Sequence, residues 1–181
     1  MWNLPNILTL LRLVLIPVYW VFMMVKDNET AALIVFISAS VTDLLDGYIA
    51  RKHNQVTDWG KLFDPVADKL MVISVLLSLL LKGLIPFAII LIVFIKEVIM
   101  MAGAAFMLRH KVVVYSKPIG KTAQFITIIG MILTFFRESF KSPIHIYVLW
   151  VGVGLMLIAL IYYSLGCLRA LRNKTNNLPT F

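Results

Sequence analysis

The sequence has little of what stabilises small secreted domains or builds soft-metal sites. It contains one cysteine, Cys167, which excludes an internal disulfide bond. Its three histidines are scattered along the chain, at positions His53, His110 and His145. A complete P-loop is also missing, because Tyr115 stands where the pattern ending in Gly120-Lys121-Thr122 requires glycine. These absences exclude a disulfide scaffold, a histidine–cysteine metal centre and a P-loop nucleoside triphosphatase.

Polar segments are short, and apolar runs dominate the chain. Hydrophobic residues make up 61% of the 181 positions, whereas a soluble domain is roughly 45–50% apolar. A membrane-spanning helix needs about 20 mostly apolar residues, and the sequence predicts six of them. Their expected ranges are 6–25, 30–51, 60–81, 85–108, 118–136 and 144–168. We therefore expect an all-α integral membrane protein, with no cleavable signal peptide at its start.

No internal repeat and no change of composition marks a second domain. The sequence thus predicts a single membrane domain over residues 1–181, with a frayed tail from about residue 169 because apolar periodicity ends there. The formal net charge of +8 could indicate a nucleic-acid partner. The basic residues, however, gather at the ends of the apolar runs, which favours contact with anionic lipid and no nucleic acid.

The basic residues also predict the orientation of the chain in the membrane. One side would hold Arg51, Lys52, Lys61, Arg109, Lys111, Lys117, Arg169, Arg172 and Lys174. The other side would hold only Lys26, Lys82, Arg137 and Lys141. Because the side richer in lysine and arginine faces the cytoplasm, we expect both termini in the cytoplasm of a bacterial-type inner membrane.

Four aspartates between apolar runs form the most informative pattern. Asp43 and Asp46 are three residues apart, and Asp64 and Asp68 are four apart, so each pair would share one face of a helix. Carboxylates in an apolar environment must be protonated, paired with cations or bound to metal. A site of oxygen ligands suits Mg²⁺, Mn²⁺ or Ca²⁺ better than zinc. Asp58 is one residue out of this phase, and we interpret it as a solvated or capping group.

Small residues accompany the aspartates. Gly47 and Ala50 continue the helix face that carries Asp43 and Asp46. They either permit close helix packing or leave space for a ligand beside bound metal, and the neighbouring acids favour the second interpretation. Two charged positions inside apolar runs also leave alternatives open. Arg12 either reaches the headgroups or faces the acids or a lipid phosphate, and Lys96-Glu97 is either a structural charge pair or part of a functional site.

A hard-metal site at the headgroup boundary favours phosphoryl chemistry. Two metal ions can clamp the attacking and leaving oxygens of an in-line displacement, and a carboxylate can accept the proton of an attacking hydroxyl. The basic residues that could hold phosphates are Arg51, Arg109, Lys117 and Lys121. No serine, cysteine or histidine is well placed to act as a nucleophile, so the sequence predicts direct transfer.

The spacing Asp43-x2-Asp46-Gly47-x2-Ala50-Arg51-x8-Gly60-x3-Asp64-x3-Asp68 resembles the complete signature of the CDP-alcohol phosphotransferase family. The resemblance implies transfer of a phosphatidyl or similar group from a CDP-linked donor to an alcohol, with release of CMP. It also implies that the four aspartates hold two divalent ions, Mg²⁺ or Mn²⁺, and that Asp68 is the general base. The residues implied in nucleotide binding are Asp46, Gly47, Ala50, Arg51 and Gly60. Such enzymes are commonly homodimers.

Other segments bear on the acceptor alcohol. Residues 3–12 and Gly120-Lys121-Thr122-Ala123-Gln124 are similar to segments of the family's phosphatidylglycerophosphate and cardiolipin synthases. The implied donor is CDP-diacylglycerol, and the implied acceptor is glycerol 3-phosphate, or phosphatidylglycerol as the alternative. The candidate residues for an acceptor phosphate are Arg109, Lys117, Lys121 and Lys96.

One departure from the glycerophosphate enzymes concerns that acceptor. Lys96-Glu97 stands where they usually have Arg-Glu, and the arginine expected about two turns later falls near Ala104. Arg109 could compensate for its absence. Outside this family, an ion transporter or channel stays an alternative. It would need acids distributed through the membrane depth, whereas only Glu97 lies deep.

Overall fold

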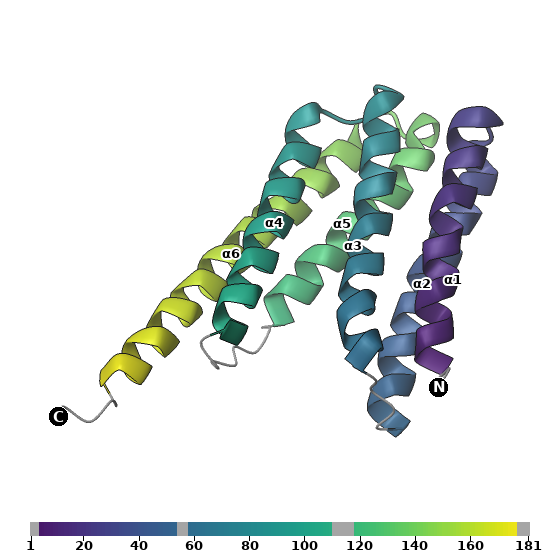
Figure 1. Ribbon diagram of the computed structural model, residues 1–181. Helices are drawn as coiled ribbons and strands as arrows, with labels where there is room; N and C mark the ends of the chain where they lie inside the picture. Colours follow the sequence, from purple (N-terminus) through teal and green to yellow (C-terminus); the bar gives the residue numbers. More distant parts are fainter. Residues whose placement is uncertain (1–3, 54–57, 110–117, 177–181) are drawn as a thin grey trace. The chain divides into compact units, whose positions relative to one another are not determined.

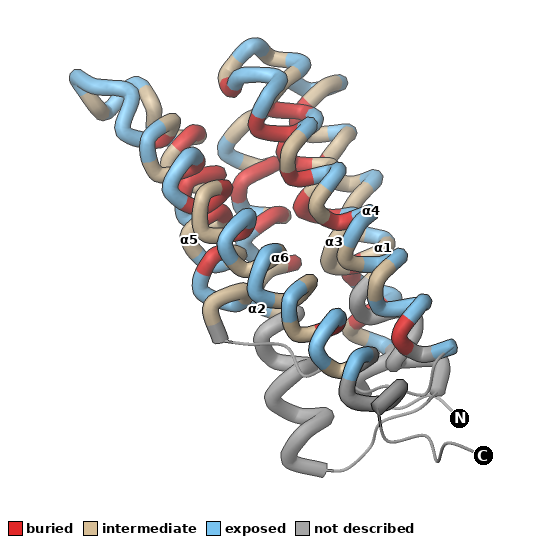
Figure 2. The backbone as a smooth tube through the Cα atoms, turned by 90° about the vertical axis from the view of Figure 1, so that its left-hand side faces the viewer, coloured by how far each residue is buried: buried red, intermediate tan, exposed pale blue. Residues whose placement is uncertain are grey.

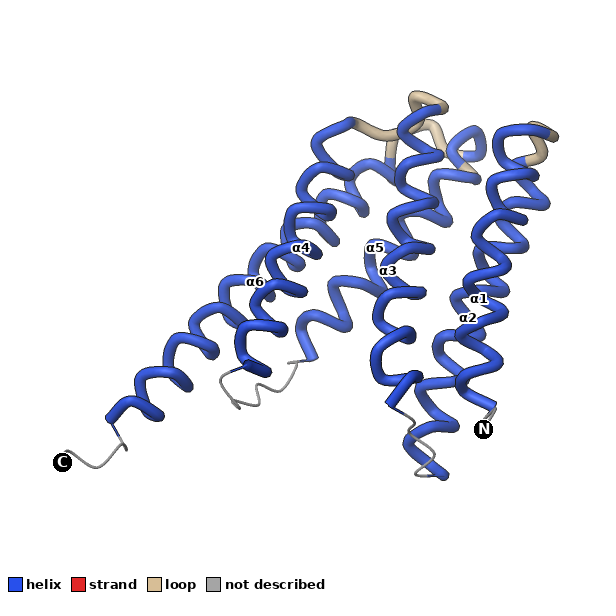
Figure 3. Tube along the Cα trace, viewed as in Figure 1, coloured by secondary structure: helices blue, strands red, loops and turns tan. Residues whose placement is uncertain are grey.

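The computed structural model describes the backbone of residues 4–53, 58–109 and 118–176 (Figure 1). Within these segments the side chains of 4–6, 43–53, 58–65, 108, 118, 171 and 173–176 are not described. Every regular element in the described segments is helical (Figure 3). The elements are α1 (Leu4–Trp20), the π-helix η1 (Val21–Val25), α2 (Glu29–His53), α3 (Asp58–Leu81), α4 (Phe87–Arg109), α5 (Pro118–Phe135), the 3₁₀ helix η2 (Arg137–Ser139) and α6 (Ile144–Asn176).

The six predicted helices all form, and their ends differ from the prediction by a few residues, except at the C-terminus. There α6 continues to Asn176, so the expectation of a frayed tail is wrong for residues 169–176. The end of an apolar stripe marks where a helix leaves an apolar environment and not where its hydrogen bonds stop. Alanine, leucine, arginine and lysine in this segment are good helix formers, and basic residues near a helix C-terminus are favourable.

Three helices in the described part of the chain are long and apolar enough to cross a membrane. They contain the spans Ile7–Val25, Phe87–Met107 and Ile144–Ala170, and shorter apolar helices cover Glu29–Thr42 and Ile119–Phe135. Exposing the apolar surfaces of these helices to water would cost far more free energy than placing them in a lipid bilayer. The protein is therefore an integral membrane protein, as expected. The count of six spans stays a prediction.

The chain packs as two compact units, Met1–Pro86 and Phe87–Phe181, and the expectation of one continuous domain stays a prediction. In the first unit, α1 lies against both α2 and α3. Its interior contains Tyr19 from α1, Met23 from η1, Phe36 from α2, and Leu76 and Leu79 from α3, all completely buried. In the parts of these helices whose burial is described, buried positions recur every three or four residues, with exposed positions between them (Figure 2).

A buried hydrogen bond fixes the register of α1 against α3. The hydroxyls of Tyr19 and Ser78 are 2.6 Å apart. Because Ser78 Oγ donates to the carbonyl of Val75 at 2.8 Å, the Tyr19 hydroxyl donates to Ser78. Two residues 59 positions apart in the sequence therefore lie at the same level of the bundle.

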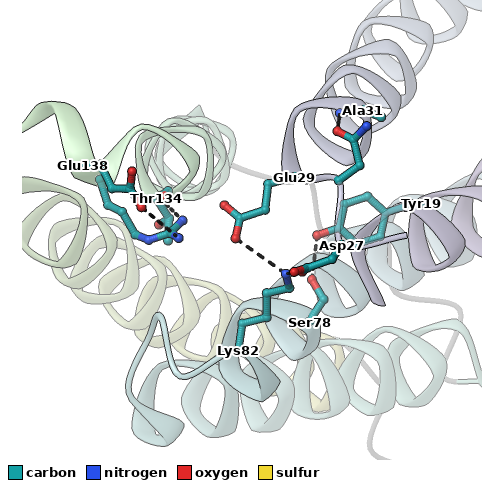
Figure 4. A network of polar contacts seen from close by, with 10 residues as sticks. Tyr19, Asp27, Glu29, Ala31, Ser78, Lys82, Thr134 and Glu138 are labelled. Carbon is teal, nitrogen blue, oxygen red and sulfur yellow. Dashed lines mark hydrogen bonds and ion pairs between the residues drawn. The ribbon is translucent and has the colours of Figure 1, made fainter. Parts of the chain in front are cut away.

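A charged cluster closes one end of this unit (Figure 4). Lys82, just past the end of α3, pairs with Asp27 and lies 3.6 Å from Glu29 at the start of α2. The hydrogen bond and charge of Lys82 hold the pKa of Asp27 below its usual value, so Asp27 is ionised at neutral pH. Gly83, with φ of 71°, ends α3, and the amide of Leu84 donates to the Leu79 carbonyl in a Schellman turn.

In the second unit, α6 packs against α4 and α5. The α5–α6 contact depends on two glycines that let the helices approach closely. A Cβ atom on Gly152 would lie 3.1 Å from the backbone nitrogen of Thr127 and closer still to its hydroxyl. A Cβ on Gly130 would lie 2.8 Å from Leu149 Cδ2. Small residues at such contacts are typical of helix packing in membranes.

The Gly152 contact gives a prediction about stability. Gly152→Leu should destabilise the protein by roughly 1–3 kcal/mol, because backbone lies where the new side chain must go. Gly154→Leu is the matched control, since nothing lies within 4 Å of a Cβ at that position of the same helix. Thermal unfolding of the purified variants in detergent measures both. Equal midpoints for the two variants would contradict the close α5–α6 approach.

Candidate active site

The four aspartates predicted to bind metal lie near one end of the α2–α3 pair. Asp43 and Asp46 are in the second half of α2, and Asp64 and Asp68 are in the first half of α3. The helical rise places all four about 9–15 Å from the adjoining helix ends. These ends are joined by residues 54–57 (Figure 1), so the two pairs come to the same end of the first unit. This is the end opposite the Lys82 cluster.

Helical register connects the aspartates to the buried faces of α2 and α3. In α2, the buried residues Ala32, Phe36 and Ala39 are spaced by four and three, and the next step of four reaches position 43. In α3, a step of four back from the buried Met71 reaches Ala67 and a step of three reaches position 68. Both inward-facing stripes therefore lead to the aspartate positions.

Asp68 is the only one of the four whose side chain is described. It is largely buried, with 20% of its side chain exposed, and its Oδ2 lies 3.7 Å from Lys69 Nζ. The described residues contain no group of three or more potential metal ligands, because the side chains of Asp43, Asp46 and Asp64 fall outside them. The side chains of the candidate nucleotide residues Ala50 and Arg51 are likewise not described, and Gly47 and Gly60 are described by their backbone alone.

The donor chemistry of this end fits hard cations. Four carboxylates from two adjacent helices would repel one another at neutral pH unless cations lay between them, and all-oxygen sites select Mg²⁺ or Mn²⁺ over softer ions. The fit rests on the positions of the aspartates along α2 and α3, whereas ligand distances are not described. Metal binding by these residues therefore stays a prediction.

Arg12 is buried, and this excludes one of the roles expected for it. Only 1% of it is exposed, so it does not reach out from the bundle toward headgroups, and that alternative is wrong. Arg12 shares an inward stripe of α1 with the buried Tyr19, seven residues later. Arg12 makes a polar, ionic or ring contact within the structure. Two alternatives remain: Arg12 faces the acidic residues, or it faces a lipid phosphate.

The candidate residues for an acceptor phosphate divide into two groups. Lys96 lies in the middle of α4 and pairs with Glu97, Nζ to Oε1, at 2.5 Å. Arg109 is the last residue of α4 and is exposed, as is Lys121 near the start of α5, while Lys117 lies outside the described residues. The 13 residues from Lys96 to Arg109 correspond to about 20 Å of helix, so these two cannot hold one phosphate together.

Comparison with known proteins shows the family to which this chain belongs. The sequence model of the CDP-alcohol phosphatidyltransferase family matches residues 2–161, which include the entire aspartate motif and five of the six long helices with part of the sixth. The chain belongs to the CDP-alcohol phosphatidyltransferase family. The resemblance found in the sequence is thereby confirmed, and the protein is an enzyme of this kind.

Relatives of this phosphatidyltransferase match either over most of their length or over a shorter and more similar stretch. The Rickettsia felis protein is 31% identical over 172 residues, covering 91% of this chain and 95% of its own. The Bacillus subtilis protein is 34% identical over 171 residues, covering 84% of this chain and 89% of its own. A 79-residue stretch is 47% identical to the Pseudomonas fluorescens protein, covering 42% of this chain and 40% of its own. All three are named CDP-diacylglycerol–glycerol-3-phosphate 3-phosphatidyltransferase.

Proposed function

We propose that this enzyme transfers the phosphatidyl group of CDP-diacylglycerol to glycerol 3-phosphate, giving phosphatidylglycerol phosphate and CMP. The observation that carries the proposal is the complete aspartate motif on α2 and α3 of a chain matched over 91% of its length by a relative of that name. Family membership supports an enzyme and gives no support to the ion-transport alternative.

The proposed reaction is a direct displacement at phosphorus. A hydroxyl oxygen of glycerol 3-phosphate attacks the phosphorus that bears the diacylglycerol, a new P–O bond forms, and the P–O bond to CMP breaks. Two divalent ions held by Asp43, Asp46, Asp64 and Asp68 would neutralise the charge of the diphosphate and of the leaving phosphate. The carboxylate of Asp68 accepts the proton of the attacking hydroxyl, since it is the last acid of the motif and is partly accessible.

Other residues would bind the nucleotide and the acceptor phosphate. Gly47, Ala50 and Gly60 leave room beside the aspartates for the cytidine diphosphate, and Arg51 supports its phosphates by charge. Lys96 is already paired with Glu97 in the described structure, so Arg109, Lys117 and Lys121 are the stronger candidates for the acceptor phosphate. We place the active site on the cytoplasmic side of a bacterial-type inner membrane, with six spans, both termini in the cytoplasm and a homodimeric assembly. The distribution of basic residues supports this orientation.

The proposal is tested by identifying the lipid that forms. Purified enzyme is offered labelled CDP-diacylglycerol with glycerol 3-phosphate, phosphatidylglycerol, inositol phosphate or serine in parallel. Phosphatidylglycerol phosphate should form only with glycerol 3-phosphate, together with an equal amount of CMP, and EDTA should stop the reaction. Cardiolipin formed from phosphatidylglycerol would replace the proposed acceptor, and full activity in EDTA would contradict the metal-dependent mechanism.

Removing the charges at Lys121 and Arg109 should weaken acceptor binding. Lys121→Ala and Arg109→Ala should each raise the KM for glycerol 3-phosphate about tenfold, which is the lower range for losing one charge-assisted hydrogen bond, with a smaller change for CDP-diacylglycerol. Steady-state kinetics with each substrate varied in turn measure the difference. Lys141→Ala removes an exposed lysine beyond the opposite end of α5 from Lys121 and should leave both constants unchanged. An unchanged acceptor KM in the first two variants would refute their assignment.

A further inference from the structure

The buried arginine of α1 is a charged group that the proposed mechanism does not use. Arg12 is among the largest completely buried side chains, and α1 contacts both α2 and α3. A buried guanidinium keeps its charge at all physiological pH values. Its burial is costly unless an anion compensates it nearby. The location of that anion determines what Arg12 does.

The hydrogen bond between Tyr19 and Ser78 gives the level of Arg12 in the bundle. Arg12 precedes Tyr19 by seven residues, and Met71 precedes Ser78 by seven, so the Cα atoms of Arg12 and Met71 lie at about the same level, roughly 10 Å below that hydrogen bond. Side chains of a helix lean toward its N-terminus. Asp68 lies about 4–5 Å closer than Met71 to the N-terminus of the parallel helix α3. The guanidinium of Arg12 therefore extends in the direction of Asp68.

The acidic residues of the first unit fall into two groups at opposite ends. Asp27 and Glu29 accompany Lys82, and Asp27 is 15 residues, or about 22 Å of chain rise, from Arg12. The other group consists of Asp43, Asp46, Asp58, Asp64 and Asp68. The positive groups of the unit near the second group, apart from Arg12, are Lys69 beside Asp68 at 3.7 Å and the basic residues Arg51, Lys52 and Lys61 nearer the helix ends.

We propose that Arg12 is a positioning residue of the active site. From α1 it supplies a fixed positive charge to the four metal-site aspartates and limits their mutual repulsion, above all while no divalent ion is bound. The inference rests on the proposed function in that it takes the four aspartates as one site. It adds that a third helix, α1, contributes to that site, so the end of the bundle keeps its packing through cycles of ion and substrate release.

Replacing the charge by an apolar side chain of similar length tests this role. In EDTA, Arg12→Met should lower the unfolding midpoint, because four carboxylates then face one another with less compensation. Adding Mn²⁺ should raise the midpoint by more in this variant than in the natural protein, and the variant should bind Mn²⁺ about tenfold more tightly, since a neighbouring positive charge is gone. Arg12→Lys keeps the charge and should behave like the natural protein.

Two further variants separate this role from ordinary loss of packing. Tyr19→Phe removes the neighbouring buried hydrogen bond and should lower the midpoint equally with and without Mn²⁺. Asp68→Asn combined with Arg12→Met removes one charge of each sign and should recover part of the midpoint lost in EDTA, whereas Asp27→Asn at the other end should recover none. The double variant also keeps the test decisive if Arg12→Met alone does not fold.

The proposal is overturned if the Mn²⁺ effect is the same in Arg12→Met and the natural protein, or if Asp68→Asn gives no recovery. An unchanged Mn²⁺ effect together with weaker binding of CDP-diacylglycerol would instead assign Arg12 to a substrate phosphate. These measurements concern unfolding and ion binding and do not depend on which lipid is made. A failure of the proposed function would appear in the product assay alone.

Discussion

Asp68→Asn is expected to abolish phosphatidyl transfer while CDP-diacylglycerol still binds. The amide cannot accept the proton of the acceptor hydroxyl, and loss of a general base costs typically 10²–10⁴ in rate. Asp68 also belongs to the proposed metal site, so we expect the turnover number to fall by at least about 10³. Release of CMP measures turnover, and equilibrium binding of labelled CDP-diacylglycerol measures retention of the donor.

Asp27→Asn is the matched control for this change. The substitution is chemically identical and lies in the same unit, but Asp27 pairs with Lys82 at the opposite end. Activity of that variant should stay within about twofold of the natural protein, since surface ion pairs contribute little. Near-normal turnover in Asp68→Asn would remove Asp68 as the base.

Gly47→Leu should strongly weaken donor binding. If the face that carries Asp46 and Gly47 leaves space for the cytidine diphosphate, a leucine side chain fills that space and competes directly with the nucleotide. We expect the affinity for CDP-diacylglycerol to fall about 100-fold or more, in line with losing several charge-assisted contacts at once. Displacement of a labelled cytidine nucleotide measures the change without requiring turnover.

Gly154→Leu is a control for this substitution as well. It places the same side chain on a membrane helix at a position with open space around it, so it tests whether a leucine on such a helix is harmful in itself. Donor affinity should be unchanged in Gly154→Leu. Unaltered donor affinity in Gly47→Leu would show that Gly47 serves helix packing only.

The helices were predictable because membrane spans are encoded in continuous apolar runs. An apolar run and its helix end at the same place where a residue such as Gly83 stops both, as at the end of α3. They disagree at α6, where the helix continues past Ala170 through polar residues to Asn176. Apolar content reports the surroundings of a helix, and the backbone hydrogen bonds that define it do not depend on that content.

The candidate site was predictable only in part. Fixed spacing along α2 and α3 was sufficient to select the aspartates and the family, because each spacing corresponds to one helix face. Spacing carries no information about contacts between helices. It left the direction of Arg12 open, and it grouped Lys96 with Arg109 although α4 separates them by about 20 Å.

Two polar contacts of the first unit had no clear signal in the sequence. Tyr19 and Ser78 look like ordinary members of apolar runs, and their hydrogen bond depends on the packing of α1 against α3. The Lys82 cluster could have been suspected, because Asp27, Glu29 and Lys82 all adjoin ends of predicted helices on the same side of the membrane. Pairing them requires knowing that the α1–α2 and α3–α4 turns are neighbours.

The most direct test of the account is a count of the divalent ions that the aspartates hold. Electron paramagnetic resonance of purified protein titrated with Mn²⁺ measures both the number of bound ions per chain and the magnetic coupling between them. The account predicts two ions per chain, close enough to couple, in the natural protein and in Asp27→Asn, with the coupled pair lost in Asp43→Asn and Asp68→Asn. Saturation without coupled ions, or a coupled pair that survives both aspartate substitutions, would contradict it.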